Sequence, residues 1–544
     1  MRTLISVFIL LLSGCIHQVL AQITLSLKDV PVTVAIEEFS SVSGYRFAYN
    51  PDILASNTLT ASVKEAPLEK AVDIVFANHY DYKIRGSYVI LLPKSQTASQ
   101  NRGPSLTISG EVLDAGTNKK LEGVSVYEVH TLKPVLTNAT GDYKLDVSLP
   151  EELAFIAISK ENYQDTVIQV HKNEKWTVAL RQKLFQEEDT TKVKDKVFAF
   201  FNGKQLDKHA KNINLTERRW MHLALTPGLS TNGFLSGQFT NKFSVNMIAG
   251  YSYALEGVEL GGFLNMERSY VEGVQLSGFG NINGDYTDGI QMAGFSNITL
   301  GPVKGVQLGG FSNHSEYMNG LQMSGAINTA RGGKGSQWAG MMNTSNGLYK
   351  GWQVSGGLNY AKVLQGVQFG VVNVADSVSS GFMVGVVNWT KNGLHHFEVG
   401  TSDITPYTIS FKSGVFPFYT ILKAGINPHE GQLWDYGMGF GSFHSIRKKA
   451  SIDFESTYHE IQSLDKGYIE GNSSEIRFQI RFGYRLANHL QLLGGPVLHY
   501  FWFHPDNPDD LAFADRFGKN AFAESNDGNR ISKAWLGYEM SVRF

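Results

Sequence analysis

The sequence predicts a mainly β protein that ends in an outer-membrane β-barrel, with a small α/β domain and a β-sandwich before it. Glycine supplies 56 of 544 residues and proline only 15, which argues against collagen and against a disordered Pro/Gly-rich chain. Aromatic residues make up 12% of the chain and charged residues 18%, below the usual quarter. Beyond the leader no apolar run is long enough to predict a membrane-spanning helix. We therefore expect an exported chain that is either soluble or a barrel.

Composition also bounds the function. A chain of 544 residues predicts about three folded units. The net charge of -2 gives no electrostatic argument for a nucleic-acid partner. The single cysteine, Cys15, excludes a disulfide framework and a cysteine-based zinc site.

Residues 1–21 predict a secretory signal peptide. Arg2 precedes an apolar run at 4–12, and the small-residue pattern Val19-Leu20-Ala21 precedes Gln22. Cleavage at this point would start the mature protein at Gln22. Lipidation of Cys15 is the alternative, because Leu12-Ser13-Gly14-Cys15 resembles a bacterial lipobox.

Residues 22–95 predict a small α/β domain. Ile23, Leu25 and Leu27 alternate with polar residues, as in a half-buried strand, and helical spacing of apolar residues follows. The expected elements are strands at 23–27, 45–49, 82–84 and 88–92 and helices at 32–41 and 67–78.

This segment resembles the secretin and TonB short N-terminal domain, abbreviated STN. The resemblance rests on Leu25-Ser26-Leu27-Lys28-Asp29-Val30-Pro31-Val32, on Phe47-Ala48-Tyr49 and on Val63-Lys64-Glu65-Ala66-Pro67-Leu68-Glu69-Lys70-Ala71. It implies a periplasmic domain that binds another protein, which is an anti-sigma regulator in some TonB-dependent receptors, and that has no catalytic residues. A folded spacer is the alternative.

Residues 104–182 follow a polar linker and predict a β-sandwich, because short apolar runs alternate with turn signals. The expected strands are 106–112, 121–127, 137–145, 153–158 and 165–170. The motifs Ile108-Ser109-Gly110-Glu111-Val112, Leu121-Glu122-Gly123-Val124 and Asn138-Ala139-Thr140-Gly141-Asp142-Tyr143 resemble the carboxypeptidase-regulatory-like domain, which is not catalytic.

The order of an STN domain, this sandwich and a barrel resembles SusC-like transporters of the Bacteroidetes type. Residues 183–214 predict only a linker, far too short for the plug domain of such transporters. This departure puts TonB-driven import by the usual mechanism in doubt.

A glycine repeat fills residues 257–388. Each copy reads glycine, apolar, glutamine, apolar, small, glycine, apolar, any residue, asparagine. The copies begin 15 or 16 residues apart, at Gly257, Gly273, Gly289, Gly305, Gly320, Gly335, Gly351, Gly366 and Gly381. The glutamine position holds Glu259 in the first copy and then Gln275, Gln291, Gln307, Gln322, Gln337, Gln353 and Gln368. The closing asparagines are Asn265, Asn281, Asn297, Asn313, Asn328, Asn343 and Asn359, and then, one place early, Asn373 and Asn388.

Two architectures fit this repeat, because Val274 and Leu276 face one side of each strand and Gln275 and Ser277 the other. In the first, each copy is one strand of a transmembrane barrel with its polar side toward a wet lumen. In the second, each copy is one turn of a β-solenoid, with stacked Gln and Asn side chains and glycine at the corners. The repeat resembles a surface-repeat family of outer-membrane proteins whose role is poorly defined.

The C-terminal part predicts barrel strands. Apolar and polar residues alternate over 452–459, 476–486 and 534–544, in runs of about ten residues that suit a tilted membrane strand. The terminal Phe544 resembles the outer-membrane barrel assembly signal. A barrel over 215–544 that includes the repeats would have about 18–20 strands, including strands at 218–228 and 243–254, and one without the repeats about ten.

No catalytic, cofactor-binding or metal-binding residue is expected. The motifs G-x-S-x-G, H-E-x-x-H and G-x-x-x-x-G-K-[ST] are missing from the sequence. Arg331-Gly332-Gly333-Lys334-Gly335-Ser336 has the wrong spacing for a phosphate loop, and His395-His396 is interpreted as structural. An acidic loop after an aromatic run is interpreted as solvated surface rather than a Ca²⁺ site; it holds His504, Asp506, Asp509, Asp510 and Asp515.

We therefore expect a non-enzymatic protein of the outer membrane with its N-terminal domains in the periplasm. The expected role is transport or passage, or surface-to-periplasm signalling, with a structural or adhesive surface-repeat protein as the alternative. The expected partners are outer-membrane lipid, a periplasmic or inner-membrane regulatory protein through residues 22–95, and the barrel assembly machinery through Phe544.

Overall fold

The chain is mainly β, as predicted. The computed structural model describes residues 22–49, 54, 58–85, 88–94, 105–129, 132–148, 153–171, 175–183, 192–213, 216–429, 432–464, 473–504, 515–526, 528 and 530–544. The predicted signal peptide and Cys15 lie outside these residues. The chain forms two compact units, 1–244 with 250–254, and 245–249 with 255–544. Each unit is described by itself.

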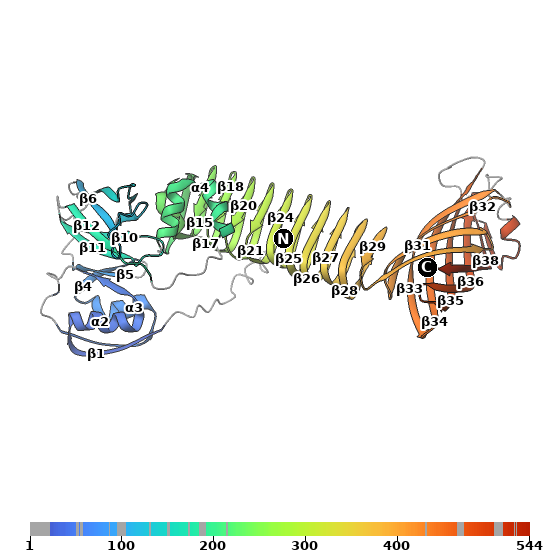
Figure 1. Ribbon diagram of the computed structural model, residues 1–544, viewed down its shortest axis with the longest axis horizontal. Helices are drawn as coiled ribbons and strands as arrows, with labels where there is room; N and C mark the ends of the chain where they lie inside the picture. The colour runs from blue at the N-terminus through green and yellow to red at the C-terminus, as the bar shows by residue number, and fades with distance from the viewer. Residues whose placement is uncertain are drawn as a thin grey trace. The chain divides into compact units, whose positions relative to one another are not determined.

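The first unit begins with the expected α/β domain (Figure 1). Its elements are β1 (Ile23–Pro31), α2 (Val32–Ser43), β2 (Arg46–Ala48), β3 (Thr58–Ala66), α3 (Leu68–Phe76), β4 (Tyr80–Arg85) and β5 (Tyr88–Pro93). Strand β1 pairs with β3, and β2, β5 and β4 form a second sheet. The two helices bury Phe39 and Phe76 in the core, with the ring centroids 5.7 Å apart. Strand β3 was not predicted.

A two-sheet sandwich follows, as predicted. It comprises β6 (Ser105–Asp114), β7 (Ser125–Glu128), β8 (Pro134–Leu136), β9 (Asp142–Ser148), β10 (Leu153–Ser159), β11 (Thr166–His171) and β12 (Lys175–Leu180). The sheets have the orders β11-β10-β7-β8 and β12-β6-β9. Val112, Val126 and Ile156 are fully buried in its core.

The prediction of a linker over 183–214 is wrong for most of that range, because it contains helix α4 (Lys192–Asn212). The helix bends at Gly203, where φ is 73°. Asn212 donates to the carbonyl of Gly123 at 2.7 Å, and the His209 ring shares a 2.9 Å hydrogen bond with Ser125. Burial lowers the pKa of His209 to about 4, so the ring is neutral at pH 7. The helix therefore packs on the sandwich through polar groups, which a hydrophobic pattern does not reveal.

The first unit ends in strands that the sequence analysis assigned to the barrel at 218–228 and 243–254. They are β13 (Glu217–Thr226), β14 (Leu229–Ser230), the 3-10 helix η3 (Gly233–Gln238), β15 (Phe239–Asn246) and β16 (Ala249–Ser252). Gln238 of η3 donates to the carbonyl of His209 at 3.0 Å, and the rings of Phe198 and Tyr251 lie 5.9 Å apart. Helix α4 therefore covers these strands, and they are not part of the barrel.

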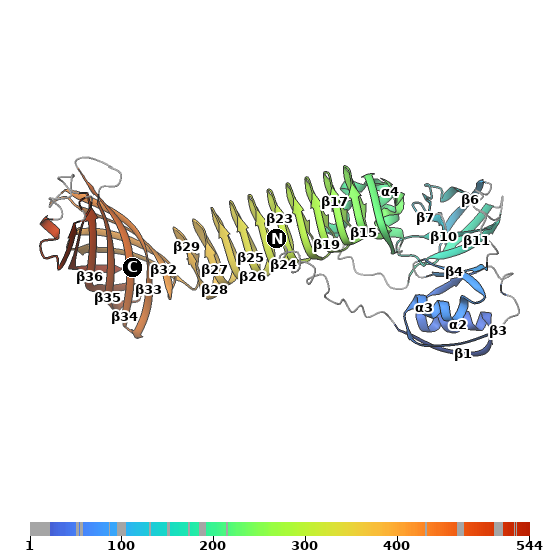
Figure 2. The same ribbon diagram turned by 180° about the vertical axis from the view of Figure 1, so that it is seen from behind.

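The second unit holds the repeat, which forms a parallel solenoid rather than barrel strands (Figure 2). Its strands are β17 (Ala254–Gly261), β18 (Leu264–Glu267), β19 (Val271–Ser277), β20 (Gly280–Asn283), β21 (Thr287–Ala293), β22 (Ser296–Thr299), β23 (Pro302–Gly309), β24 (Ser312–Ser324), β25 (Ile327–Ala339), β26 (Met342–Ser355), β27 (Leu358–Phe369), β28 (Val372–Val384) and β29 (Val387–Thr390). Gly273 pairs with Gly289 and Asn281 with Asn297, in parallel register. Each copy thus returns to the same place one coil further on, which explains the constant 15–16 spacing.

Glycine is required where the coils stack. The repeat-starting glycines all have φ between 103° and 155°, a range that residues with a side chain rarely adopt. A Cβ on Gly273 would also lie 1.9 Å from the carbonyl oxygen of Gly257 in the preceding coil. The glycine excess in the composition therefore reflects backbone stacking.

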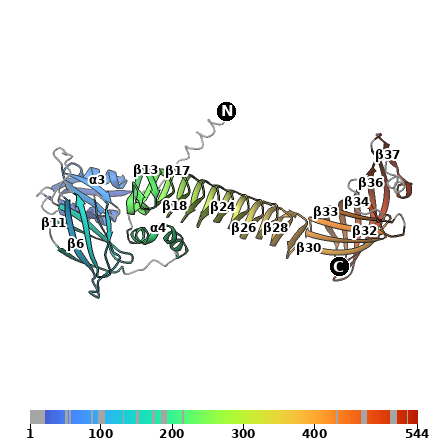
Figure 3. The same ribbon diagram turned by 90° about the horizontal axis from the view of Figure 1, so that it is seen from above.

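The described parts of 394–544 contain a closed barrel of eight antiparallel strands (Figure 3). They are β30 (Leu394–Ser402), β31 (Tyr407–Val415), β32 (Phe418–Asn427), β33 (Leu433–Arg447), β34 (Ala450–Ser463), β35 (Ser473–Ala487), β36 (Leu490–Phe503) and β38 (Ile531–Arg543). Strand β30 closes the ring by pairing with β38, and the short β37 (Ala523–Asn526) also pairs with β38. The predicted barrel is confirmed, but it begins at Leu394 rather than at 215, and it lacks the 18–20 strands expected from a barrel built of repeats.

Candidate functional site

The barrel has charged side chains inside and apolar side chains outside. On β35, Arg477 and Arg481 are each 1% exposed, whereas the intervening Phe478 is 51% exposed and Phe482 is 58% exposed. The period of two along a strand produces this separation, because successive side chains point to opposite faces of a sheet. The predicted alternation over 476–486 is therefore confirmed.

Arg481 is at the centre of a network of ion pairs in the lumen. Its Nη1 lies 2.8 Å from Glu398 Oε2, and its Nη2 lies 2.7 Å from Glu455 Oε1. Lys412 Nζ bridges the same two carboxylates, at 3.0 Å and 2.5 Å. Arg543 pairs with Glu398 at 2.6 Å. Each buried charge thus has partners of opposite sign, as burial in a medium of low polarity requires.

A second group of charges fills the lumen around Arg477. Its Nη2 lies 2.6 Å from Asp435, and its Nε lies 2.8 Å from Glu475. The rings of His459 and His499 contact these two carboxylates in turn. An eight-stranded barrel is just wide enough for side chains to fill it. The two networks therefore occupy the space that a pore would need.

The outer surface of the barrel is apolar. Exposed side chains include those of Phe397, Ile409, Met438, Phe440, Phe454, Ile480, Tyr484, Leu486, Leu498, Leu536, Tyr538 and Met540. A contiguous apolar surface of this kind marks contact with a membrane or a protein partner. No helix among the described residues is long and apolar enough to cross a membrane.

The solenoid interior holds two lines of hydrogen-bonded amide side chains, which we call the Gln ladder and the Asn ladder. In the Gln ladder each Nε2 donates to the preceding coil, as from Gln291 to Gln275 at 3.0 Å. In the Asn ladder each Nδ2 donates to the following coil, as from Asn281 to Asn297 at 2.8 Å. The two ladders therefore run in opposite directions, and their side chains are almost fully buried. The stacked side chains suggested for a solenoid are present.

The ends of the Gln ladder differ from its middle. At the first end, Glu259 accepts hydrogen bonds from Gln275 and Asn246, both at 2.8 Å. A carboxylate suits this position, because it accepts without requiring a further acceptor of its own. At the other end Met383 takes the glutamine position, and Gln368 Oε1 has no hydrogen-bond partner.

A second carboxyl group, Glu267, is also enclosed in the first coil. It is 0% exposed. Burial, together with the nearby charge of Glu259, raises the pKa of Glu267 well above its usual value. The sequence pattern gave no sign of this residue, because it precedes a turn outside the repeated motif.

The residues considered in the sequence for metal, phosphate or calcium binding lie in separate parts of the chain. His395 stacks on Trp389 with the ring centroids 4.0 Å apart, and its Nε2 lies 2.8 Å from the carbonyl oxygen of Thr390. Arg331 lies within strand β25 and pairs with Glu316 at 3.2 Å, so 331–336 do not form a loop. Asp515 contacts Lys533 at 3.5 Å. Asp506, Asp509 and Asp510 lie outside the described residues.

The described residues contain no group of three or more His, Cys, Asp or Glu side chains that could hold a metal ion. No protein-family model, no curated protein and no solved structure matches the chain. The resemblances to the STN domain, to the carboxypeptidase-regulatory-like domain and to surface repeats therefore stay predictions that rest on the quoted motifs.

Proposed function

We propose that this chain is a non-enzymatic outer-membrane protein whose barrel is a sealed anchor, not a channel, for a periplasmic solenoid and its N-terminal domains. The observation that carries this proposal is the filled lumen, in which Arg481 is paired with Glu398 and Glu455. Opening a water-filled path would separate these buried charges. Removal of one partner from such a pair costs about 3–5 kcal/mol. This favours the structural alternative over passage through the barrel.

The lengths of the barrel connections support the orientation. Two-residue turns, Phe416-Pro417, Lys448-Lys449 and Asn488-His489, join strands at one end, and longer connections at 403–406, 428–432, 464–472 and 504–530 join them at the other. Outer-membrane barrels have short turns on the periplasmic side and longer loops outside. The first barrel residue, Leu394, and the terminal Phe544 lie at the end with the short turns, because β30 leads from there into 403–406. The solenoid thus enters the barrel from the periplasmic side.

Two measurements on the full-length chain test this proposal. In planar bilayers, the reconstituted protein is expected to give no steady single-channel conductance, with a general porin as the positive control. In isolated membranes, alkaline carbonate washing is expected to leave the protein in the pellet. A stable ohmic conductance would contradict the sealed lumen, and release by carbonate would contradict the anchor.

Signalling through residues 22–95 stays a prediction. One side of this domain is already occupied, since Tyr88 donates to the carbonyl of Asp165 in the sandwich at 3.0 Å and Arg46 donates to the same oxygen at 3.3 Å. A regulator would have to bind elsewhere on the domain. Co-purification of an inner-membrane or periplasmic regulator with the full chain, lost on substitution of exposed Val42, would support it.

A further inference from the structure

The outer side of the solenoid carries an apolar groove. In each coil the strand that follows the repeat-starting glycine turns its glutamine inward and two neighbours outward, such as Val274 and Leu276 around Gln275. The second outward residue is apolar in seven successive coils that line the groove: Leu260, Leu276, Met292, Leu308, Met323, Trp338 and Val354. We call these seven side chains the groove wall.

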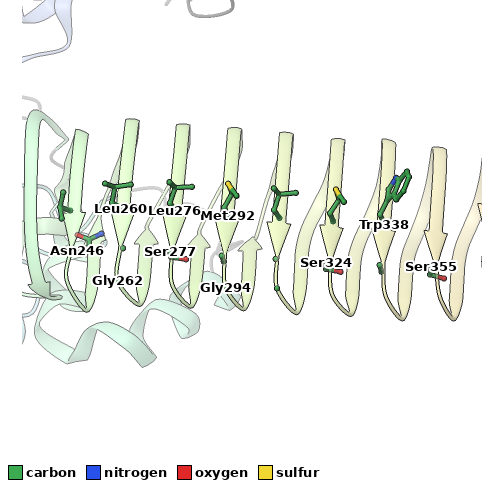
Figure 4. Close-up of a pocket in the computed structure, with 18 of the residues that line it drawn as sticks. Asn246, Leu260, Gly262, Leu276, Ser277, Met292, Gly294, Ser324, Trp338 and Ser355 are labelled. Atoms are coloured by element: carbon green, nitrogen blue, oxygen red, sulfur yellow. The ribbon is translucent and has the colours of Figure 1, made fainter. Parts of the chain in front are cut away.

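The floor of the groove is made of small residues. The residues after the groove wall are glycine, alanine or serine, such as Ser277, Gly294 and Ser355 (Figure 4). At several of these floor positions only glycine fits. A Cβ on Gly294, for example, would lie 2.0 Å from the carbonyl oxygen of Gly278. The resulting groove has a volume of about 1260 Å³. The small residues of the floor thus follow from the same close stacking that forms the coils.

The lining selects for a long apolar occupant. None of the described residues that line the groove is charged. Seven coils stacked at about 4.8 Å give the groove a length of about 29 Å. The acyl chains of one leaflet span about 15 Å, half of a bilayer's hydrocarbon core, so an extended acyl chain fits within this length. An extended peptide would bring N–H and C=O groups that an apolar wall cannot satisfy. An acyl chain has no such groups.

The apolar surface of the solenoid continues onto the barrel. Phe382 of β28 faces outward in the row of Val274, and its ring lies 5.0 Å from that of Phe418 on β32. Phe418 in turn lies 5.3 Å from Phe440. Both barrel residues border a depression on the outer barrel surface, together with Phe454, Phe478, Leu498 and Leu536. The outward residues of the two coils between the groove and the barrel are also apolar, since Val367, Phe369 and Val384 are partly exposed there. Apolar side chains thus connect the barrel surface with the groove.

We propose that the groove binds the acyl chain of a membrane lipid drawn from the bilayer around the barrel. This inference rests on the proposed membrane anchor, because the bilayer is the source of the lipid. The solenoid would then hold lipid outside the bilayer, along the groove wall, with the chain's length parallel to the stack of coils.

The test uses the full-length protein in vesicles that contain phosphatidylcholine with a photoactivatable diazirine on its acyl chain. After irradiation, mass spectrometry locates the lipid adducts. We expect adducts on the groove wall, for example at Met292 and Met323, as well as on the barrel surface near Leu498. Adducts confined to the barrel would overturn this inference and leave the anchor intact. Absence of adducts from the barrel would instead contradict the anchor.

Matched variants separate specific binding from general stickiness. The double variant Met292→Gln, Met323→Gln is expected to lower solenoid adducts about tenfold, the effect of about 1.4 kcal/mol of lost binding. The control Ile298→Gln alters a partly exposed residue on β22, the second strand of the coil that holds Met292, and is expected to leave the adducts unchanged. Equal labelling of β22 and of the groove wall, or an equal loss in the control, would overturn the inference. In all variants, unchanged adducts on the barrel report that the protein is folded in the vesicle.

Discussion

The side-chain amide of Asn388 donates a hydrogen bond of 2.7 Å to the hydroxyl of Thr420. Asn388 is the last member of the Asn ladder, and Thr420 belongs to barrel strand β32. The backbone N–H of Asn388 also donates to Ser413 of β31, at 3.0 Å. A buried amide donor that is left unpaired costs about 1–3 kcal/mol, so a partner at the end of the Asn ladder is stabilising. The barrel wall supplies that partner, and it thereby closes one end of the solenoid.

Removal of the Thr420 hydroxyl tests this junction. Thr420→Val removes the shorter of the two hydrogen bonds that the Asn388 amide donates and leaves the 3.2 Å bond to the carbonyl of Gly385. The loss of one buried hydrogen bond is expected to lower the free energy of unfolding by about 1–3 kcal/mol. Chemical denaturation of the detergent-solubilised protein measures this change. Thr401→Val, at a partly exposed position of β30, serves as the control. If the two variants cost the same, Thr420 does not terminate the ladder.

A methyl group in the glycine stack should be strongly destabilising. In Gly320→Ala, the new Cβ would lie 2.0 Å from the carbonyl oxygen of Gly305, at a φ of 141°. Backbone strain of about 1–3 kcal/mol and overpacking of about 1–3 kcal/mol should add, so the loss should exceed about 2 kcal/mol. Gly494→Ala in the barrel, where the nearest atom is a flexible Met540 side chain at 3.4 Å, is the matched control. Thermal unfolding followed by circular dichroism compares the two, and equal midpoints would be inconsistent with the stacking.

Substitution in the middle of the Gln ladder should lower the free energy of unfolding more than substitution at its end. Gln322→Met removes the donor to Gln307 and the acceptor of Gln337, both at 2.8 Å, and so leaves two buried polar atoms unpaired. Gln368→Met removes the donor to Gln353 and a longer 3.4 Å bond to the carbonyl of Val374, but it removes no acceptor, since its own Oε1 has no partner. At about 1–3 kcal/mol for each unpaired atom, the first variant should be about twice as destabilising. Denaturant midpoints check this, and a larger loss for Gln368→Met would refute the ladder's direction.

The buried carboxyl group of Glu267 should make stability depend on pH. Its pKa is raised in the folded protein, so the folded state keeps a proton that the unfolded chain releases above about 4.5. Stability should therefore fall as the pH rises from about 4.5 toward the raised folded-state pKa. Glu267→Gln should remove this fall and should increase stability at pH 7.

Denaturation of wild type and Glu267→Gln at pH 4 and pH 7 checks this linkage. The two proteins should differ more at pH 7 than at pH 4. The control Glu316→Gln alters an exposed carboxylate paired with Arg331 and should not reproduce the effect. A difference of equal size at both pH values would show that Glu267 is not held in its protonated form.

The repeat shows what a sequence pattern can and cannot decide. The inward position of Gln275 and the outward position of Leu276 were predicted correctly, because alternation with a period of two holds in a solenoid and in a barrel alike. The choice between the two depends on whether neighbouring copies run parallel. Only the pairing of Gly273 with Gly289, in parallel register, decides that.

Other features of the fold could not be predicted, because they depend on contacts between residues far apart in the sequence. Helix α4 is held by His209 and Asn212 against the sandwich, so its polar sequence read as a linker. The charged side of β35 was recognised, but the pairing of Arg481 with Glu398, 83 residues earlier, required the closed ring. The groove wall likewise combines single residues from seven copies. Such sites arise from stacking, and each copy alone contributes only one residue to the groove wall.

The parallel stack outside the barrel can be tested directly with a disulfide. Ser296 and Ser312 are in register on neighbouring strands, and their hydroxyl oxygens lie 2.8 Å apart. Cysteines at facing positions of paired strands meet the distance that a disulfide needs. Cys15, in the predicted leader, is the sole native cysteine. In Cys15→Ser protein, the pair Ser296→Cys, Ser312→Cys should oxidise nearly completely in native membranes, and the half-coil pair Ser296→Cys, Lys304→Cys should stay reduced. Oxidation of the half-coil pair in preference to the in-register pair would contradict the parallel solenoid.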